Sequence, residues 1–218
     1  HECAGVVERV GQGVTTVKPG DTVVVTLIRS CGHCHGCSRG MPVTCSTQFP
    51  LDAKSPITDA KGNSIVQSMR TGGFAEYVVV HESQCVSVPT SIPAPSASLL
   101  ACGVITGFGA VTNTAKVTPG SHVVVIGTGG VGLNSIQGAH VSGARSVIAV
   151  DIADNKVEAA KKFGATHGVN SKTSDVTAKV MEITGGHGAD YVFVTVGAKQ
   201  AFDSSYGMLA KGGSMVMV

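Results

Sequence analysis

The hydrophobic pattern of the chain changes character near residue 103. From there to residue 218, short and almost wholly apolar runs alternate with segments that have helical periodicity. The runs are HVVVIG, SVIAVD, THGVN, YVFVTVG and SMVMV, and a helix-like segment follows each of the first four. Strands that are apolar throughout and are separated by helices are typical of a parallel sheet covered on both faces. We therefore predict an α/β fold with five parallel strands over residues 104–218.

Residues 1–103 show a different pattern, made of short β-branched runs. AGVVERV and DTVVVT are separated by the turn-rich GQG and KPGD, and FAEYVVV is followed by CVSVP. Such runs bounded by glycine and proline predict strands joined by turns, so we expect this half to be all-β. Residues 46–72 mix Pro, Gly, Ser and charged residues without a period, and we predict a long irregular excursion there.

Composition limits the classes of function. Hydrophobic residues make up 43% of the chain, which is ample for a buried core. Sixteen basic and 14 acidic side chains leave a net charge of +2 without a run of Lys or Arg, so a nucleic-acid partner is not expected. The chain has no stretch of about 18 consecutive apolar residues and no signal-peptide pattern. These features predict a soluble cytoplasmic protein without a membrane segment.

Both ends of the chain look internal to a longer protein. The chain opens on His1 without a methionine, and it stops at SMVMV, which reads as a buried strand. A buried strand at the end of a chain would leave backbone groups unpaired. We expect a fragment, and an unpaired sheet edge near Val218 would favour a homo-oligomer in the full-length protein.

The first apolar run of the second half leads into the sequence GTGGVG. Gly127, Gly129 and Gly132 have the G-x-G-x-x-G spacing, which permits a tight turn, close approach of a pyrophosphate and close helix–strand packing. Asp151 ends the next run, 19 residues after Gly132, where its carboxylate can accept hydrogen bonds from ribose hydroxyls. The alternative is a glycine-rich turn and a surface Asp. Because Asp151 would repel the 2′-phosphate of NADP, we predict NAD as the cofactor.

Four of the seven cysteines lie in the segment CGHCHGCSRGMPVTC. Cys31, Cys34, Cys37 and Cys45 have the spacing C-x2-C-x2-C-x7-C, and four thiolates can fill the tetrahedral shell of a structural zinc. Disulfides are less favoured because the cysteine count is odd and no secretion signal is present. A [4Fe–4S] cluster is less favoured because its bacterial pattern ends in C-x3-C-P, whereas here the last gap is seven residues and Ser46 follows.

Together with this cysteine lobe, four further segments complete a family pattern: HECAG, VKPGDTVVV, LLACGVITGFGA and VVVIGTGGVGLNSIQGA. The chain resembles the zinc-dependent medium-chain alcohol dehydrogenases, and among them the glutathione- or mycothiol-dependent formaldehyde dehydrogenases. The resemblance implies a GroES-like β domain over residues 1–103 and a Rossmann NAD-binding domain over residues 104–218, incomplete at its C-terminus. It also implies hydride transfer between an alcohol, or a hydroxymethyl-thiol adduct, and NAD.

A second, catalytic zinc is implied by the resemblance alone. The family holds this zinc through a Cys, a His and a later Cys, with a Glu beside the His. His1, Glu2 and Cys102 match the last three of these positions, and the first Cys would lie before residue 1. We therefore expect the site to be unfinished in residues 1–218 and their turnover of alcohols to be poor. Taken alone, Cys102 would more often be a small buried hydrophobe.

The resemblance also suggests residues that lie near the cofactor. Thr106 is expected near the nicotinamide, although a helical Thr that bonds its own backbone is an equal alternative. Lys156 could reach the ribose, although an exposed helix Lys is the commoner case. The other residues expected to contact NAD are Gly127, Thr128, Gly129, Gly130, Val131, Gly132, Asp151 and Val196.

Two functions of other classes remain open from the sequence. One is a non-catalytic dinucleotide-binding protein, which the incomplete set of catalytic zinc ligands motivates. The other is an iron–sulfur electron-transfer protein that uses the cysteine lobe.

Overall fold

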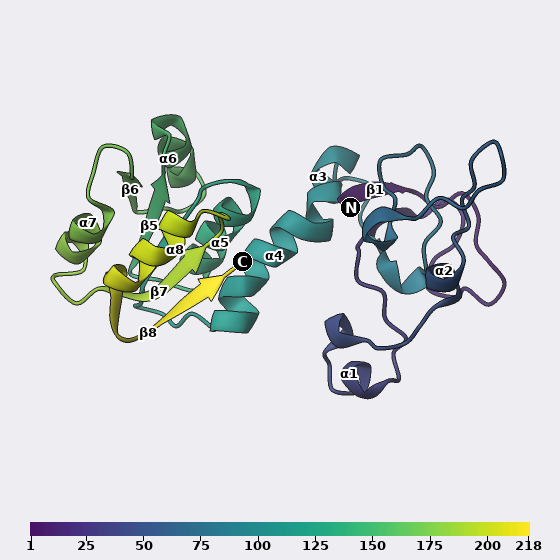
Figure 1. Cartoon of the computed structure of the whole chain (residues 1–218), viewed down its shortest axis with the longest axis horizontal. Coiled ribbons are helices and arrows are strands. Elements are labelled where there is room, and N and C mark those ends of the chain that lie inside the picture. Colours follow the sequence, from purple (N-terminus) through teal and green to yellow (C-terminus); the bar gives the residue numbers. More distant parts are fainter. The chain divides into compact units, whose positions relative to one another are not determined.

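The computed structural model describes all residues from 1 to 218. The chain divides into two compact units, His1–Cys102 (unit 1) and Gly103–Val218 (unit 2), and the path of the chain through each is shown in Figure 1.

Unit 2 is built on a five-stranded sheet with the order β6-β5-β4-β7-β8. All neighbouring strands run parallel, and the sheet confirms the five strands predicted from the apolar runs. The strands are β4 (His122–Ile126), β5 (Ser146–Asp151), β6 (His167–Asn170), β7 (Ala189–Val194) and β8 (Leu209–Met217).

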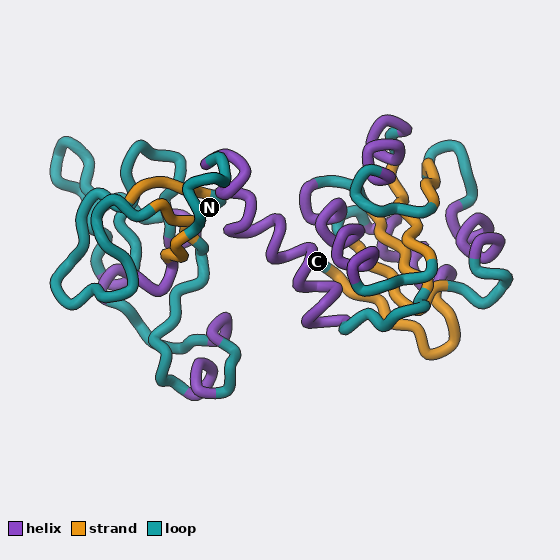
Figure 2. The backbone as a smooth tube through the Cα atoms, turned by 180° about the vertical axis from the view of Figure 1, so that it is seen from behind, coloured by secondary structure: helices purple, strands orange, loops and turns teal.

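Helices cover both faces of this sheet, as Figure 2 shows for the strands in orange and the helices in purple. Val123 and Val125 of β4 belong to a buried cluster with Ile136 of the helix that follows the strand. Val124, between them, belongs to the opposite cluster with Val180. Because successive side chains of a strand point to opposite faces, a wholly apolar strand supplies both cores. The helices are α5 (Gly130–Val141), α6 (Asp154–Lys161), α7 (Val176–Ile183) and α8 (Lys199–Ser205).

The strand order of unit 2 creates a candidate ligand-binding position at the carboxyl edge of the sheet. β4 lies at the centre with β5 on one side and β7 on the other. The chain first builds outward from β4 through β5 to β6, and then returns to the other side for β7 and β8. In open α/β sheets, ligands bind outside the carboxyl ends of the strands at this point of reversal.

Unit 1 has much less regular structure than expected. Its sheet has three antiparallel strands, β1 (Cys3–Val6), β2 (Thr22–Val25) and β3 (Cys85–Ser87). The prediction of a strand over FAEYVVV, residues 74–80, is wrong, because this segment pairs with no other strand. Its aromatic side chains are exposed instead, Phe74 completely and Tyr77 by 73%. A β-branched run becomes a strand only where a neighbour pairs its backbone groups.

The irregular excursion predicted over residues 46–72 is largely confirmed. One four-residue helix, one short 3-10 helix and an isolated bridge between Thr58 and Ser64 are its only regular features. The short helices of unit 1 that precede the long helical run are α1 (His35–Ser38), η1 (Pro42–Thr44), α2 (Pro50–Ala53), η2 (Ser68–Arg70) and η3 (Glu82–Gln84).

A continuous helical run extends from Ala94 to Ala115. It consists of α3 (Ala94–Leu99), the π-helical η4 (Leu100–Val104), α4 (Ile105–Gly109) and η5 (Ala110–Ala115). By length and composition alone this run, with a hydropathy of 1.5, is apolar enough to cross a membrane. The core helix of a globular protein passes the same test, and Ser, Thr, Gly and Asn interrupt the run. One such helix is therefore weak evidence for a membrane span.

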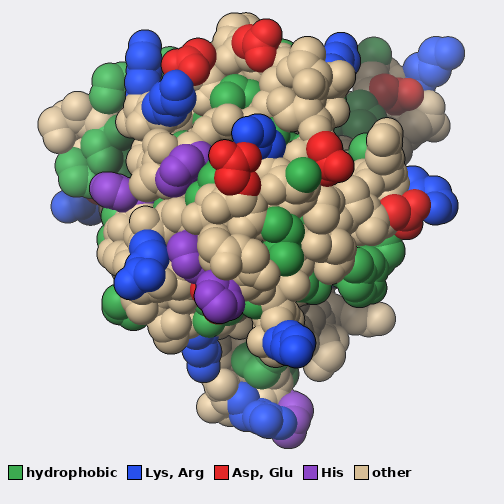
Figure 3. Space-filling view, turned by 90° about the vertical axis from the view of Figure 1, so that its left-hand side faces the viewer, with side chains coloured by type: hydrophobic (Ala, Val, Ile, Leu, Met, Phe, Trp, Pro, Cys, Tyr) green, Lys and Arg blue, Asp and Glu red, His purple; other side chains and the backbone are tan.

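Charged side chains of both signs are interspersed on the face that Figure 3 presents. This distribution agrees with the small net charge of +2. A single-sign patch that would attract a polyanion is not visible on that face.

Candidate functional site

The four predicted zinc ligands of unit 1 come together in space. The Sγ atoms of Cys31, Cys34, Cys37 and Cys45 all lie within 4.8 Å of one another, and the four thiols are free. A tetrahedral zinc with Zn–S bonds of about 2.3 Å places its sulfur ligands about 3.8 Å apart. The cluster therefore fits a structural zinc, and four thiolates leave no open position for a substrate.

Two tight helical turns shape this lobe with few apolar residues. α1 begins after Cys34, whose backbone N–H donates to Cys31 Sγ at 3.3 Å. Gly36 lies in α1 and is buried against η1, where a Cβ would come within 2.2 Å of Thr44 Oγ1. Only glycine permits this close approach, which brings the last cysteine back to the first three.

Hydrogen bonds prepare two of the thiols for a cation. The hydrogen bond from the Thr47 side chain is the largest influence on Cys31 and helps to lower its pKa to about 5. The backbone N–H groups of Cys37 and Ser46 lower the pKa of Cys34 to about 7. Burial is the main cause that raises the pKa of Cys37, to about 11. Cys31 is therefore a thiolate at neutral pH and Cys34 is partly ionised, which favours a cation, and a bound zinc displaces the remaining protons.

The predicted catalytic zinc ligands do not form a comparable group. The four-cysteine cluster is the one set of three or more His, Cys, Asp or Glu side chains near enough to share an ion. His1 and Glu2 precede β1, and Cys102 lies half-buried in η4. A π-helical turn such as η4 often occurs at a functional site. The roles of these residues, and of Thr106 in α4, stay predictions.

A buried polar network, which no sequence pattern predicts, joins distant segments of unit 1. Arg29 is 2% exposed and donates through Nε to Gln84 Oε1 at 2.8 Å and through Nη1 to Asp52 Oδ1 at 2.9 Å. Gln84 is fully buried, and its Nε2 donates to the carbonyl oxygens of Thr26 and Arg70 at 2.9 and 3.2 Å. These residues lie far apart in the sequence, so no local pattern announces the network.

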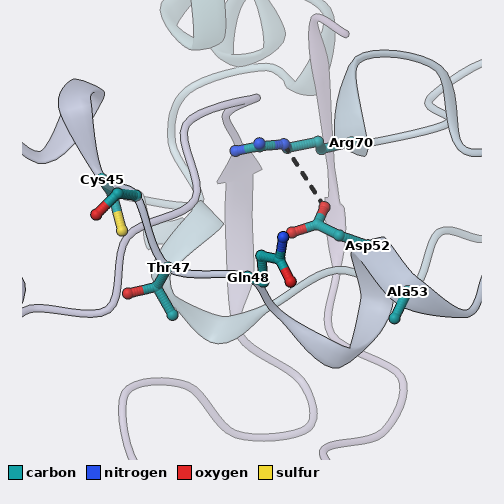
Figure 4. A pocket seen from close by; sticks show the side chains of 7 residues that line it. Cys45, Thr47, Gln48, Asp52, Ala53 and Arg70 are labelled. Atoms are coloured by element: carbon teal, nitrogen blue, oxygen red, sulfur yellow. Dashed lines mark ion pairs between the residues drawn. The ribbon is translucent and has the colours of Figure 1, made fainter.

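A cavity of about 520 Å³, lined mostly by polar residues, lies beside this network. Figure 4 shows Arg70 and Asp52 facing each other across it, with Arg70 Nε 3.6 Å from Asp52 Oδ1. Arg70 and the preceding Met69 have left-handed backbone φ values of 58° and 53°. The hydrogen bonds to the Arg70 carbonyl hold this uncommon conformation. The lining residues are Cys45, Ser46, Thr47, Gln48, Asp52, Ala53 and Arg70.

In unit 2, the predicted cofactor residues gather at the carboxyl edge of the sheet. Gly127 follows β4 with a φ of 94°, and a Cβ there would lie 2.4 Å from Val196 Cγ1 beyond the end of β7. A Cβ on Gly132 would lie 1.8 Å from the Gly127 carbonyl oxygen. Gly127 favours glycine because of its left-handed φ, and Gly132 requires glycine because a side chain would collide with the backbone.

The other two glycines of the loop leave an open cradle. A Cβ built on Gly129 or Gly130 would meet nothing within 4 Å, and both residues are exposed at the start of α5. The first turn of a helix presents unpaired N–H groups and the positive end of the helix dipole. This cradle therefore fits a pyrophosphate.

Asp151 ends β5 with its carboxylate almost buried, at 9% exposure. Oδ2 accepts hydrogen bonds from Thr128 N and Thr128 Oγ1, both at 2.9 Å. Oδ1 accepts from Ile152 N at 2.8 Å and from Ala153 N at 3.2 Å. Burial raises the pKa of Asp151, but the four hydrogen bonds outweigh burial and the net pKa is lowered. Asp151 is therefore a carboxylate at neutral pH.

The remaining predicted cofactor residues differ in position. Val131 lies half-buried in the first turn of α5, Val196 is 39% exposed, and Lys156 is exposed on α6. Gly107 was not predicted as a site residue, yet a Cβ there would lie 2.1 Å from the Val131 carbonyl oxygen. Thr195 was not predicted either, and its Oγ1 donates to the Gly127 carbonyl at 2.9 Å. The glycine of VITGFGA was a visible signal for the first, but nothing in the sequence marked the second.

Two family models match the chain. The family model of the alcohol dehydrogenase GroES-like domain matches residues 1–90, and that of the zinc-binding dehydrogenases matches residues 130–218. The chain belongs to the zinc-dependent medium-chain alcohol dehydrogenase family.

Similar members of this family come from distant organisms. "Alcohol dehydrogenase B" of Mycobacterium tuberculosis is 41% identical, and "Alcohol dehydrogenase class-3" of Pisum sativum is 39% identical. The benzyl alcohol dehydrogenase structure from Acinetobacter calcoaceticus matches with a TM-score of 0.87 at 35% identity. All three matches cover 100% of this chain and 60% of the relative. The chain thus spans 60% of the length of these relatives.

The family and the geometry together indicate which cofactors fit the two sites. The four-cysteine cluster fits a structural zinc. NAD is the dinucleotide expected for the family, and the glycine cradle with Asp151 fits it.

Proposed function

We propose that this protein is a zinc- and NAD-dependent oxidoreductase that interconverts alcohols with aldehydes or ketones. The observation that carries the proposal is the cofactor site of unit 2, where Gly127, Gly132 and Asp151 meet at the reversal point of the sheet. The four-cysteine lobe in the same chain supports it, because the lobe fits the zinc of this family.

Each group of residues has a separate task in this proposal. The N–H groups at the start of α5 hold the pyrophosphate, and Asp151 accepts hydrogen bonds from the adenosine ribose. Cys102 and His1 would hold the catalytic zinc, with Glu2 beside them. When bound, that zinc supplies an electrophile at the alcohol oxygen and NAD supplies the hydride acceptor. The role of the protein is to hold the reacting carbon beside the nicotinamide in a water-poor site.

The substrate class is proposed from the relatives. One similar structure is named a benzyl alcohol dehydrogenase and one relative a class-3 alcohol dehydrogenase. The resemblance to formaldehyde dehydrogenases adds hydroxymethyl adducts of glutathione or mycothiol. We propose a primary alcohol or such an adduct as substrate, and this set defines the panel to assay.

The test is NADH formation on this panel by the full-length protein that contains residues 1–218, before and after Cys102→Ala. We expect turnover with NAD, its loss in the Cys102→Ala variant, and unchanged affinity for NAD in both. Zinc content should fall by one per chain in the variant, because the four-cysteine zinc remains. Turnover that survives Cys102→Ala would show that the catalytic zinc is held elsewhere. A protein that binds NAD but oxidises no alcohol on the panel would overturn the proposed reaction.

We further infer a cytoplasmic homo-oligomer without a nucleic-acid or membrane partner. The mixed surface charge and the lack of a Lys/Arg run support the inference that nucleic acid is not a partner. Light scattering on the full-length protein and fractionation of the cells that express it test these inferences. A monomer in solution, or a protein that sediments with membranes, would contradict them.

A further inference from the structure

The acceptor sites of Asp151 are fully used before any cofactor is bound. A carboxylate offers about four lone-pair sites. Asp151 Oδ2 receives two hydrogen bonds from Thr128, one from N and one from Oγ1. Oδ1 receives the other two, from the backbone N–H groups of Ile152 and Ala153. A ribose hydroxyl that is to donate to Asp151 must therefore displace one of these four donors.

The four donors differ in how readily they can move. Three are backbone N–H groups: Thr128 N belongs to the tight turn after β4, and Ile152 N and Ala153 N belong to the turn after β5. Moving any of them would require the backbone to change. The fourth donor is the Thr128 hydroxyl, which leaves the carboxylate by rotation about a single side-chain bond. It is the donor that a ligand can displace at the lowest cost.

We propose that the Thr128 hydroxyl caps Asp151 Oδ2 in the cofactor-free protein and yields this acceptor to a ribose hydroxyl when NAD binds. Thr128 and Asp151 are 4% and 9% exposed, so without the cap a nearly buried carboxylate would lose one of its hydrogen bonds. Thr128 is thus an internal competitor of the cofactor: it stabilises the free protein and weakens NAD binding. This inference rests on the proposed function, because it takes NAD as the ligand of Asp151.

A purely structural role for Thr128 predicts the opposite sign. If the hydroxyl serves to hold Asp151 in the orientation that binds ribose, its removal leaves the carboxylate less well placed and NAD binds more weakly. If the hydroxyl competes with ribose, its removal frees an acceptor and NAD binds more tightly. The sign of the change in the dissociation constant therefore separates the two roles.

The test compares Thr128→Val, which removes the hydroxyl at constant shape, with Thr128→Ser, which retains it. NAD affinity is measured by calorimetric titration, and thermal unfolding is followed with and without saturating NAD. We expect the Kd of Thr128→Val for NAD to fall about three- to tenfold. This is the change in affinity that corresponds to the net free energy of one hydrogen bond. Its Tm should fall without NAD and recover when NAD is saturating. Thr128→Ser retains the hydroxyl, so its Kd for NAD should stay near that of the unmodified protein. Its Tm should fall equally with and without NAD, because a buried methyl group is lost.

Thr184→Val provides the matched control. Thr184 is also 4% exposed, and its Oγ1 donates to the Val180 carbonyl at 2.8 Å after α7, near the amino end of β7. This variant should lower the Tm equally with and without NAD and leave the Kd unchanged. Thr128→Ala also lacks the hydroxyl and repeats the test should Thr128→Val not fold.

The possible results are distinct. Tighter NAD binding by Thr128→Val, with Thr128→Ser unchanged, supports the inference. Weaker or unchanged NAD binding by Thr128→Val overturns it while the proposed function stands. Failure of the unmodified protein to bind NAD at all overturns the proposed function and this inference with it.

Discussion

The two units of the chain are held together by different physical means. Unit 2 buries two apolar clusters of twelve and ten residues on the two faces of its sheet. The corresponding cluster of unit 1 has only three fully buried members, Val24, Ala97 and Ala101. Unit 1 compensates with the polar network around Arg29 and Gln84 and with the four-cysteine lobe. A region with a small apolar core needs such additional links.

This difference explains why the sites are built as they are. The cofactor site of unit 2 needs exact backbone positions at Gly127 and Gly132, and a close-packed sheet supplies them. The cysteine lobe of unit 1 makes its own order once the metal binds, because metal binding supplies folding free energy. The two units should therefore respond to different perturbations, and the predictions below exploit this.

Loss of a zinc ligand should have the largest effect, and it should be confined to unit 1. Cys37→Ser removes one of four thiolates, so the structural zinc should be lost. Structural zinc in small domains contributes binding free energy of about 10 kcal/mol or more. Metal analysis should show one zinc fewer per chain, and limited proteolysis should cleave within residues 31–45. NAD affinity, which depends on unit 2, should not change.

Cys85→Ser is the control for this change. Cys85 lies half-buried in β3 of the same unit but outside the four-cysteine cluster. Zinc content and protease resistance should stay as in the unmodified protein. Retention of zinc and of protease resistance by Cys37→Ser would contradict the assignment of the lobe.

Disruption of the polar network around Arg29 and Gln84 should have the second-largest effect, on the stability of unit 1. Gln84→Leu removes the acceptor of Arg29 Nε and both side-chain donors to the carbonyls of Thr26 and Arg70, so a buried donor and two acceptors lose a hydrogen-bond partner. We expect unit 1 to lose about 3 kcal/mol of unfolding free energy, measured by urea denaturation. The same substitution at the exposed Gln48 should cost less than about 0.5 kcal/mol. Equal costs at the two positions would mean that the network contributes little.

Glycine substitutions test the close packing of unit 2. Gly132→Ala places a Cβ 1.8 Å from the Gly127 carbonyl oxygen, so we expect a cost of about 1 to 3 kcal/mol and loss of NAD binding. Gly130→Ala meets no atom within 4 Å and should leave the unfolding free energy within about 0.5 kcal/mol. It should still weaken NAD binding, because its methyl group enters the pyrophosphate cradle. Unchanged stability in Gly132→Ala would show that the loop can relax.

The same contrast decides what the sequence could predict. β4, β5 and β7 of unit 2 contain apolar runs of four or more residues, and helices separate the strands, so the local pattern was sufficient to predict all five. β6 and β8 are less apolar, and only short apolar runs marked them. The cysteine lobe and the glycine loop were predictable because their spacing is itself the signal. FAEYVVV has the composition of a strand but no neighbour to pair with. The network around Arg29 joins residues up to 58 positions apart, and no local pattern reports such contacts.

The smallest expected effect concerns the acid sensitivity of unit 2 through Asp151. Its hydrogen bonds lower its pKa in the folded protein, so the ionised form stabilises the fold above the unfolded pKa of about 3.9. This contribution should disappear as the pH falls through the lower, folded pKa. Asp151→Asn has no such titration. The difference in unfolding free energy between the two proteins, measured in urea, should therefore be constant from about pH 6 to 7 and shrink from about pH 5 down to pH 3. The common effects of other carboxylates cancel in this difference. A difference that stays constant or grows toward low pH would show that Asp151 is not stabilised as a carboxylate in the folded protein.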